Sequence, residues 1–119
     1  MITCYAYKKC SSCKSAENYL KRHGIPFSSI DITEHPPSAG LLKRLVKNYG
    51  LGIKPFLNTS GEVYRTLGLK DKLKTMTEDD VIDLMAKYGR LIKRPLITNS
   101  EGLVTLGFKE ETMLVWTRS

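Results

Sequence analysis

Long apolar stretches, a leader-like start and abundant cysteine are all missing from this chain of 119 residues. No apolar run approaches the roughly 18–20 residues that a membrane-spanning helix needs, which argues against a membrane protein. Three cysteines, an odd number, do not suggest a secreted scaffold held together by disulfides. The first residues, Met1 to Tyr5, have neither the basic start nor the long apolar stretch of a secretory signal. We therefore expect a cytoplasmic protein with no membrane partner.

Acidic side chains are also scarce relative to basic ones, 12 against 19, and the net charge is +7. Such an excess permits an anionic partner, namely nucleic acid, an acidic protein surface or a small oxyanion, but a soluble protein with a basic surface explains it equally well. Because the basic residues form no dense block and few aromatic residues lie among them, we expect no direct binding of nucleic acid. The hydrophobic fraction of 41% and the charged fraction of 26% are those of an ordinary globular domain.

Two of the cysteines form a C-x-x-C motif, Cys10-Ser11-Ser12-Cys13. In a zinc site this motif needs a second pair of ligands, and the remaining candidates, Cys4, His23 and His35, form no closely spaced pair, so we expect no metal. In a redox site the motif stands alone, between a strand and the N-terminus of a helix. Cys4 alternates with apolar residues in a predicted strand, and we expect it in the core.

Hydrophobic periodicity predicts a β-α-β unit, a helical middle and a β-β-α end. The predicted strands cover residues 2–6, 26–32, 96–98 and 103–106. The predicted helices cover residues 11–23, 38–50, 77–89 and 109–116, with short helical turns between 64 and 69. This order predicts an α/β protein with a thioredoxin-like fold and a mixed four-stranded sheet. We expect one domain over residues 1–119, with a helical insertion at about residues 38–89.

Cys10 is predicted to lie in the turn that precedes the first helix. Unpaired backbone N–H groups and a partial positive charge at a helix N-terminus stabilise a thiolate, and Lys9 nearby adds positive potential. Cys13 lies one turn into the helix and is expected to be shielded. We predict that Cys10 attacks the substrate and that Cys13 resolves the mixed disulfide. Two unrelated buried thiols are the alternative.

Arg94-Pro95 is the second informative pair. Only about 5–6% of X–Pro bonds in folded proteins are cis, but a proline that opens a strand beside the C-x-x-C motif of this fold is a candidate. Arg94 would then bring its guanidinium toward Cys10, where it could stabilise a thiolate or hold an oxyanion through two parallel hydrogen bonds. A surface arginine beside a trans proline is the alternative.

Several of these segments together resemble the glutaredoxin-coupled arsenate reductase (ArsC) family and its Spx- and MgsR-type relatives. The similarity spans nearly the whole chain, and the order and spacing of its segments are specific. The matching segments are YKKCSSCK at 7–14, HGIPF at 23–27, NTSG at 58–61, YR at 64–65, LGLK at 67–70, LIKRPLI at 91–97 and GF at 107–108.

This resemblance implies a nucleophilic role for Cys10 and places Arg94 before a cis-proline at Pro95. The arsenate reductases of the family cradle the oxyanion with several arginines, but here Asn58 stands at one such place and no arginine lies near Phe108. Those reductases also usually lack the second cysteine of the pair. Cys13 therefore indicates the small Spx-like branch, where the two cysteines would form a thiol–disulfide switch.

The resemblance also suggests partners. Spx regulators bind the α subunit of RNA polymerase, and Gly52 matches a glycine used at that contact, although a turn requirement explains a glycine equally well. We predict first a small thiol–disulfide oxidoreductase, second a redox-sensing regulator that binds RNA polymerase, and third an arsenate reductase. We expect no bound cofactor. We expect an external reductant such as glutaredoxin, thioredoxin or a low-molecular-weight thiol to reduce the protein. The protein itself would act on a thiol or disulfide partner protein or on a small oxyanion.

Overall fold

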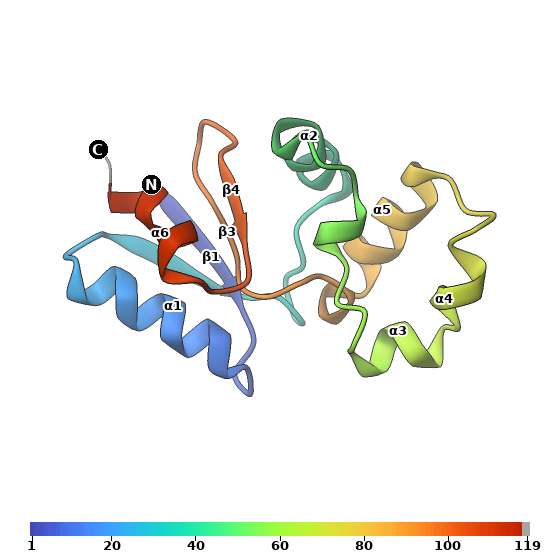
Figure 1. The fold of residues 1–119 in the computed structure, drawn as a ribbon, viewed down its shortest axis with the longest axis horizontal. Coiled ribbons are helices and arrows are strands. Elements are labelled where there is room, and N and C mark those ends of the chain that lie inside the picture. Colours follow the sequence, from blue (N-terminus) through green and yellow to red (C-terminus); the bar gives the residue numbers. More distant parts are fainter. Residues whose placement is uncertain (118–119) are drawn as a thin grey trace.

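The computed structural model describes residues 1–117, which form a mixed α/β structure around a four-stranded sheet (Figure 1). The strands are β1 (Ile2–Ala6), β2 (Phe27–Asp31), β3 (Leu96–Thr98) and β4 (Val104–Leu106), in the order β2-β1-β3-β4. β1 pairs parallel with β2 and antiparallel with β3, and β3 pairs antiparallel with β4. The mixed four-stranded sheet confirms the predicted fold class.

Two helices cover one face of this sheet. α1 (Ser11–Arg22) connects β1 to β2, as a parallel pair requires, and α6 (Glu110–Thr117) ends the described chain. Figure 1 shows both on the same side of the strands. The core on this face combines residues from β1 and β3 with residues from the two helices: Cys4, Ala6, Cys13, Ala16, Tyr19, Leu20, Ile97, Met113 and Trp116.

The central helical segment packs against the opposite face. Its elements are α2 (Ala39–Tyr49), η1 (Lys54–Phe56), α3 (Glu62–Thr66), α4 (Leu69–Lys72), α5 (Glu78–Lys87) and η2 (Gly89–Leu91). Tyr5, Leu96 and Val104 of the sheet join the core of this segment. Because Cys4 and Tyr5 belong to different core clusters, the predicted alternation of β1 is confirmed. In Figure 1, α3 and α4 lie at the end of the molecule far from α1.

Local capping signals fix the two longer helices of this segment. The Ser38 hydroxyl accepts a hydrogen bond from the Leu41 N–H at 3.2 Å, and Thr77 and Asp80 form a reciprocal capping box at the start of α5. Pro55 lies in the first turn of the short η1, where the N–H that proline lacks would have had no helical partner. Within residues 1–117 no helix combines the length and apolar character needed to cross a membrane.

Candidate redox site

Cys10 is the N-cap residue of α1. Its sulfur accepts a hydrogen bond from the Cys13 N–H at 3.3 Å, and its own N–H donates to the Tyr7 carbonyl at 3.1 Å. The half-buried sulfur therefore lies at the positive end of a 12-residue helix. Backbone N–H groups and the helix dipole favour negative charge at such a position, which is the geometry that a thiolate nucleophile needs.

Cys13 lies one turn further along α1 and is only 1% exposed. Burial raises the pKa of its thiol to about 12, and the neighbouring Cys10 adds to this rise. A backbone hydrogen bond from Tyr7 and the charge of Arg94 oppose the rise without cancelling it. At neutral pH the Cys13 thiol is therefore protonated, and Cys10 is the more accessible of the two cysteines. This difference is the one expected between a resolving cysteine, Cys13, and an attacking cysteine, Cys10.

We expect iodoacetamide to alkylate Cys10 at least about tenfold faster than Cys13 at pH 7, because only a thiolate that the reagent can reach reacts quickly. Labelling rates of Cys10→Ser and Cys13→Ser, read by mass spectrometry, measure the difference. The rate at Cys13 should still be rising with pH above 9, since the pKa of its thiol is raised. Equal rates at the two cysteines would contradict the assignment of roles.

A hollow of about 310 Å³ opens beside Cys10. The lining residues come from the N-cap and first turn of α1, from the segment before α3, from the turn before β3, and from the end of β4 and the segment after it: Cys10, Ser12, Asn58, Lys93, Arg94, Leu106, Gly107, Phe108 and Lys109. The structure therefore brings Arg94 and Asn58 to the same hollow as Cys10. Lys93 and Lys109 were missed by the sequence reasoning, although their positions beside Arg94 and after Phe108 could have indicated them.

Arg94 is held in place by its neighbours. The bond between Arg94 and Pro95 is cis, the Arg94 Nη1 donates to the Arg90 carbonyl at 3.0 Å, and the guanidinium carbon lies 5.2 Å from the centre of the Tyr7 ring. This distance is that of a cation–π contact. The guanidinium of Arg90 lies at the same distance from the Tyr7 ring.

Two predicted site residues lie elsewhere. Lys9 is exposed in the turn before Cys10 and is not among the residues that line the hollow. Gly52 is exposed between α2 and η1 with a φ of +83°, and a Cβ added there would meet nothing within 4 Å. The positive φ accounts for a glycine at this position through backbone conformation.

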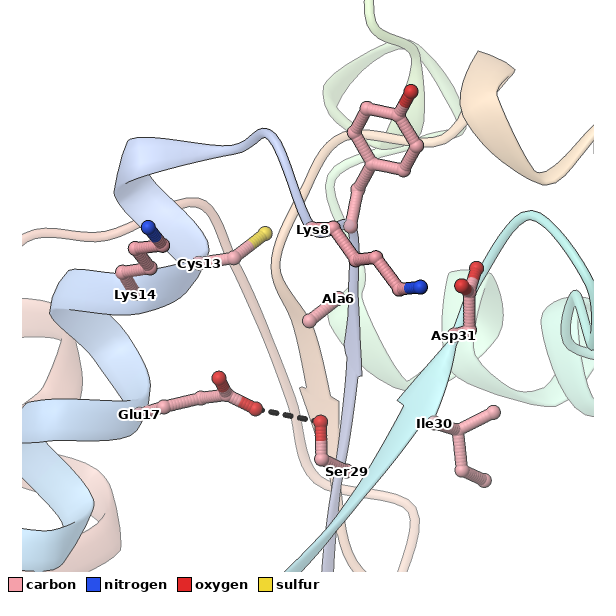
Figure 2. Close-up of a pocket in the computed structure, with 9 residues that line it drawn as sticks. Ala6, Lys8, Cys13, Lys14, Glu17, Ser29, Ile30 and Asp31 are labelled. Carbon is pink, nitrogen blue, oxygen red and sulfur yellow. Dashed lines mark hydrogen bonds between the residues drawn. The ribbon is translucent and has the colours of Figure 1, made fainter.

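Cys13 lines a second hollow, of about 360 Å³, between α1 and the ends of β1 and β2. Figure 2 shows the Cys13 side chain directed into this space, with Lys8 on its other side. The Glu17 carboxylate accepts a hydrogen bond of 2.6 Å from the Ser29 hydroxyl and so ties α1 to β2 (Figure 2). The two cysteines thus line different hollows although they are three residues apart.

The third thiol, Cys4, is part of the core. It is 0% exposed, and burial together with the charge of Glu17 raises its pKa to about 12. All three cysteines are free thiols. Among residues 1–117, no group of three or more His, Cys, Asp or Glu side chains is placed to hold a metal ion.

A C-x-x-C motif where a strand meets a helix, with a cis-proline opening β3, defines a thioredoxin-like thiol protein. Residues 5–115 match the model of the ArsC family, and the chain belongs to that family. It is 49% identical to the uncharacterized protein YusI of Bacillus subtilis, over 92% of each chain. It is 28% identical to the global transcriptional regulator Spx 1 of Lactococcus lactis, over 93% of this chain and 84% of that one. The solved arsenate reductase of Vibrio cholerae superposes with a TM-score of 0.83 at 29% identity, over 96% and 95% of the chains.

Proposed function

We propose that this protein is a thiol–disulfide oxidoreductase that uses Cys10 and Cys13 as its redox pair. The observation that carries the proposal is the pairing of Cys10, half-buried at the N-terminus of α1, with the buried thiol of Cys13 one turn behind it. Arg94 supports the pair, because its positive charge favours thiolates in the hollow that it shares with Cys10.

The reaction balances without a bound cofactor. The Cys10 thiolate attacks one sulfur of a substrate disulfide, forms a mixed disulfide and displaces the other half as a thiolate. Cys13 then loses its proton to that leaving thiolate and attacks the Cys10 sulfur, which forms the Cys10–Cys13 disulfide and releases the second half of the substrate. The substrate gains two electrons, the protein loses two, and an external dithiol or low-molecular-weight thiol restores the reduced protein.

We expect mild peroxide to produce a reversible disulfide between Cys10 and Cys13 and to leave Cys4 reduced. Peroxide converts the Cys10 thiolate to a sulfenic acid, and Cys13 condenses with it and releases water. Peptide mapping by mass spectrometry under non-reducing conditions identifies the pair, and a dithiol should reverse it. A protein that stays reduced while an exposed model thiol oxidises, or one in which Cys4 pairs, would contradict the proposal.

A redox-sensing regulator is the second candidate. Leu51 is 72% exposed beside Gly52, and Spx 1 aligns with 93% of this chain. Binding of the purified RNA polymerase α subunit by the parent protein but not by Leu51→Glu, in one redox state only, would favour this function. If the α subunit binds neither redox state, the regulator is rejected and the oxidoreductase remains the proposed function.

We expect arsenate turnover to be slow or absent. Among residues 1–117, Arg94 is the one guanidinium that lines the hollow, and Asn58 offers only a neutral amide where the family's reductases carry an arginine. Charge-assisted hydrogen bonds are about twice as strong as neutral ones. Both the binding of arsenate and the stabilisation of the transition state should therefore be weaker. A coupled assay with an authentic arsenate reductase as control tests this. Turnover of about 1–1000 per second, abolished by Cys10→Ser, would restore arsenate as the substrate.

A further inference from the structure

The Cys10 hollow is lined by several cations. Lys93, Arg94 and Lys109 contribute three positive charges, and within the described residues 1–117 no acidic side chain is among the lining residues. Gly107 lines the same hollow, and a Cβ added there would come within 3.1 Å of the Lys93 Cε. A positive φ of 73° at this glycine turns the chain there. The three cations come from two segments far apart in the sequence, residues 93–94 and 109, which meet at this hollow.

Arg94 also carries an unused hydrogen-bond donor. Among residues 1–117 its Nε is buried and has no partner, and its Nη1 donates to the Arg90 carbonyl. A carboxylate accepts charge-assisted hydrogen bonds from guanidinium and ammonium groups, and it carries the negative charge that the hollow complements.

The remaining lining residues limit the size and shape of the ligand. Leu106 and Phe108 form an apolar wall, and Ser12 and Asn58 add neutral polar groups. The volume of about 310 Å³ is at the lower end of the roughly 300–1,000 Å³ typical of small-molecule pockets. One arm of a small aliphatic disulfide fits this description, with its sulfur at Cys10 and its charged end among the cations.

We propose that the Cys10 hollow selects small anionic disulfides, whose carboxylates pair with Lys93, Arg94 and Lys109. This inference rests on the proposed function and names its substrate class. In the reaction the reduced protein and one disulfide of a thiol acid give the Cys10–Cys13 disulfide and two molecules of the free thiol acid. The carboxylates take no part in the electron transfer and serve to hold the scissile bond against the Cys10 sulfur.

The test compares three disulfides of similar size and different charge: dithiodipropionate, which is dianionic, bis(hydroxyethyl) disulfide, which is neutral, and cystamine, which is dicationic. Single-turnover oxidation of the reduced protein is followed for the parent, for the double variant Lys93→Gln/Lys109→Gln, and for Lys70→Gln. Lys70 lies exposed on α4, away from the hollow, and controls for the loss of a positive charge. Each variant is compared with the parent on the same disulfide, so the intrinsic reactivity of the disulfide cancels.

We expect the double variant to oxidise about tenfold more slowly with dithiodipropionate, because local positive potential raises the encounter rate of an anion. Its rate with bis(hydroxyethyl) disulfide should stay within about twofold of the parent, and Lys70→Gln should leave all three rates unchanged. Raising the ionic strength should shrink the tenfold difference, since salt screens exposed charges. Equal losses with all three disulfides would overturn the inference and leave the redox pair standing. A parent protein that none of the three disulfides oxidises would overturn the proposed function as well.

Discussion

Replacing Cys10 with serine is expected to lower the rate of thiol–disulfide exchange by at least about a thousandfold, because a serine hydroxyl is not ionised at neutral pH and forms no disulfide. Cys13 cannot take over, since it is buried and its pKa is raised to about 12. Stopped-flow oxidation of the reduced protein with a small disulfide measures the loss. The matched variant Cys13→Ser should still attack but should stop at the mixed disulfide, which intact-mass spectrometry detects as an adduct on Cys10.

Cys4→Ala is the control for these two variants. It removes the third thiol from the core without touching the Cys10 hollow, so exchange should stay within about twofold of the parent. Full exchange activity in Cys10→Ser would contradict the assignment of Cys10 as the nucleophile. Release of both halves of the substrate by Cys13→Ser would show that Cys13 does not resolve the mixed disulfide.

Replacing Gly89 with alanine is expected to destabilise the protein by about 3 kcal/mol, at the upper end of what overpacking a well-filled interior costs. Gly89 begins η2 and packs directly on the backbone at the end of β2. A Cβ there would lie much closer to the Ile32 carbonyl oxygen than van der Waals contact allows and would also crowd Pro36. Backbone cannot move aside as a flexible side chain can, so relief requires a shift of η2 away from the sheet. Urea denaturation followed by circular dichroism measures the change.

Gly40→Ala is the matched control for Gly89→Ala. Gly40 lies exposed within α2, and a Cβ added there would meet nothing within 4 Å. Alanine is favoured over glycine in a helix by about 0.5–1 kcal/mol, so this variant should be slightly more stable than the parent. If both variants shift the free energy of unfolding in the same direction by similar amounts, the close approach at Gly89 is not what limits that position.

Much of the fold could be predicted because its signals are local. Ser38 and Thr77 mark helix starts through their own side-chain hydrogen bonds, and Gly50 ends α2 with a φ of +76°. The alternation of Cys4 and Tyr5 assigns the two faces of β1 correctly, since strand geometry sends successive side chains to opposite sides. The position of Cys10 at a helix N-terminus follows from the same local reasoning.

The composition of the site depends on contacts between distant segments, and these were harder to predict. Lys9 is next to Cys10 in the sequence, yet its turn carries it into solvent, whereas Lys93 and Lys109 come to the hollow from segments far along the chain. Arg94 is fixed by the Arg90 carbonyl and by the ring of Tyr7, which leads out of β1. No periodicity in the sequence encodes such pairings between separate elements.

The burial of Cys4 gives the protein an internal probe of native-state opening. Cys4 lies in β1 among residues of α1 and α6, and no reagent reaches it while both helices remain on the sheet. In a protein whose other two thiols are replaced, and at reagent concentrations where reclosing outpaces labelling, the labelling rate of Cys4 therefore equals its unprotected rate multiplied by the equilibrium constant for opening. Because β1 leads directly into the Cys10 turn, this rate reports the fraction of molecules in which the scaffold beneath the redox pair is open, and it does so without denaturant.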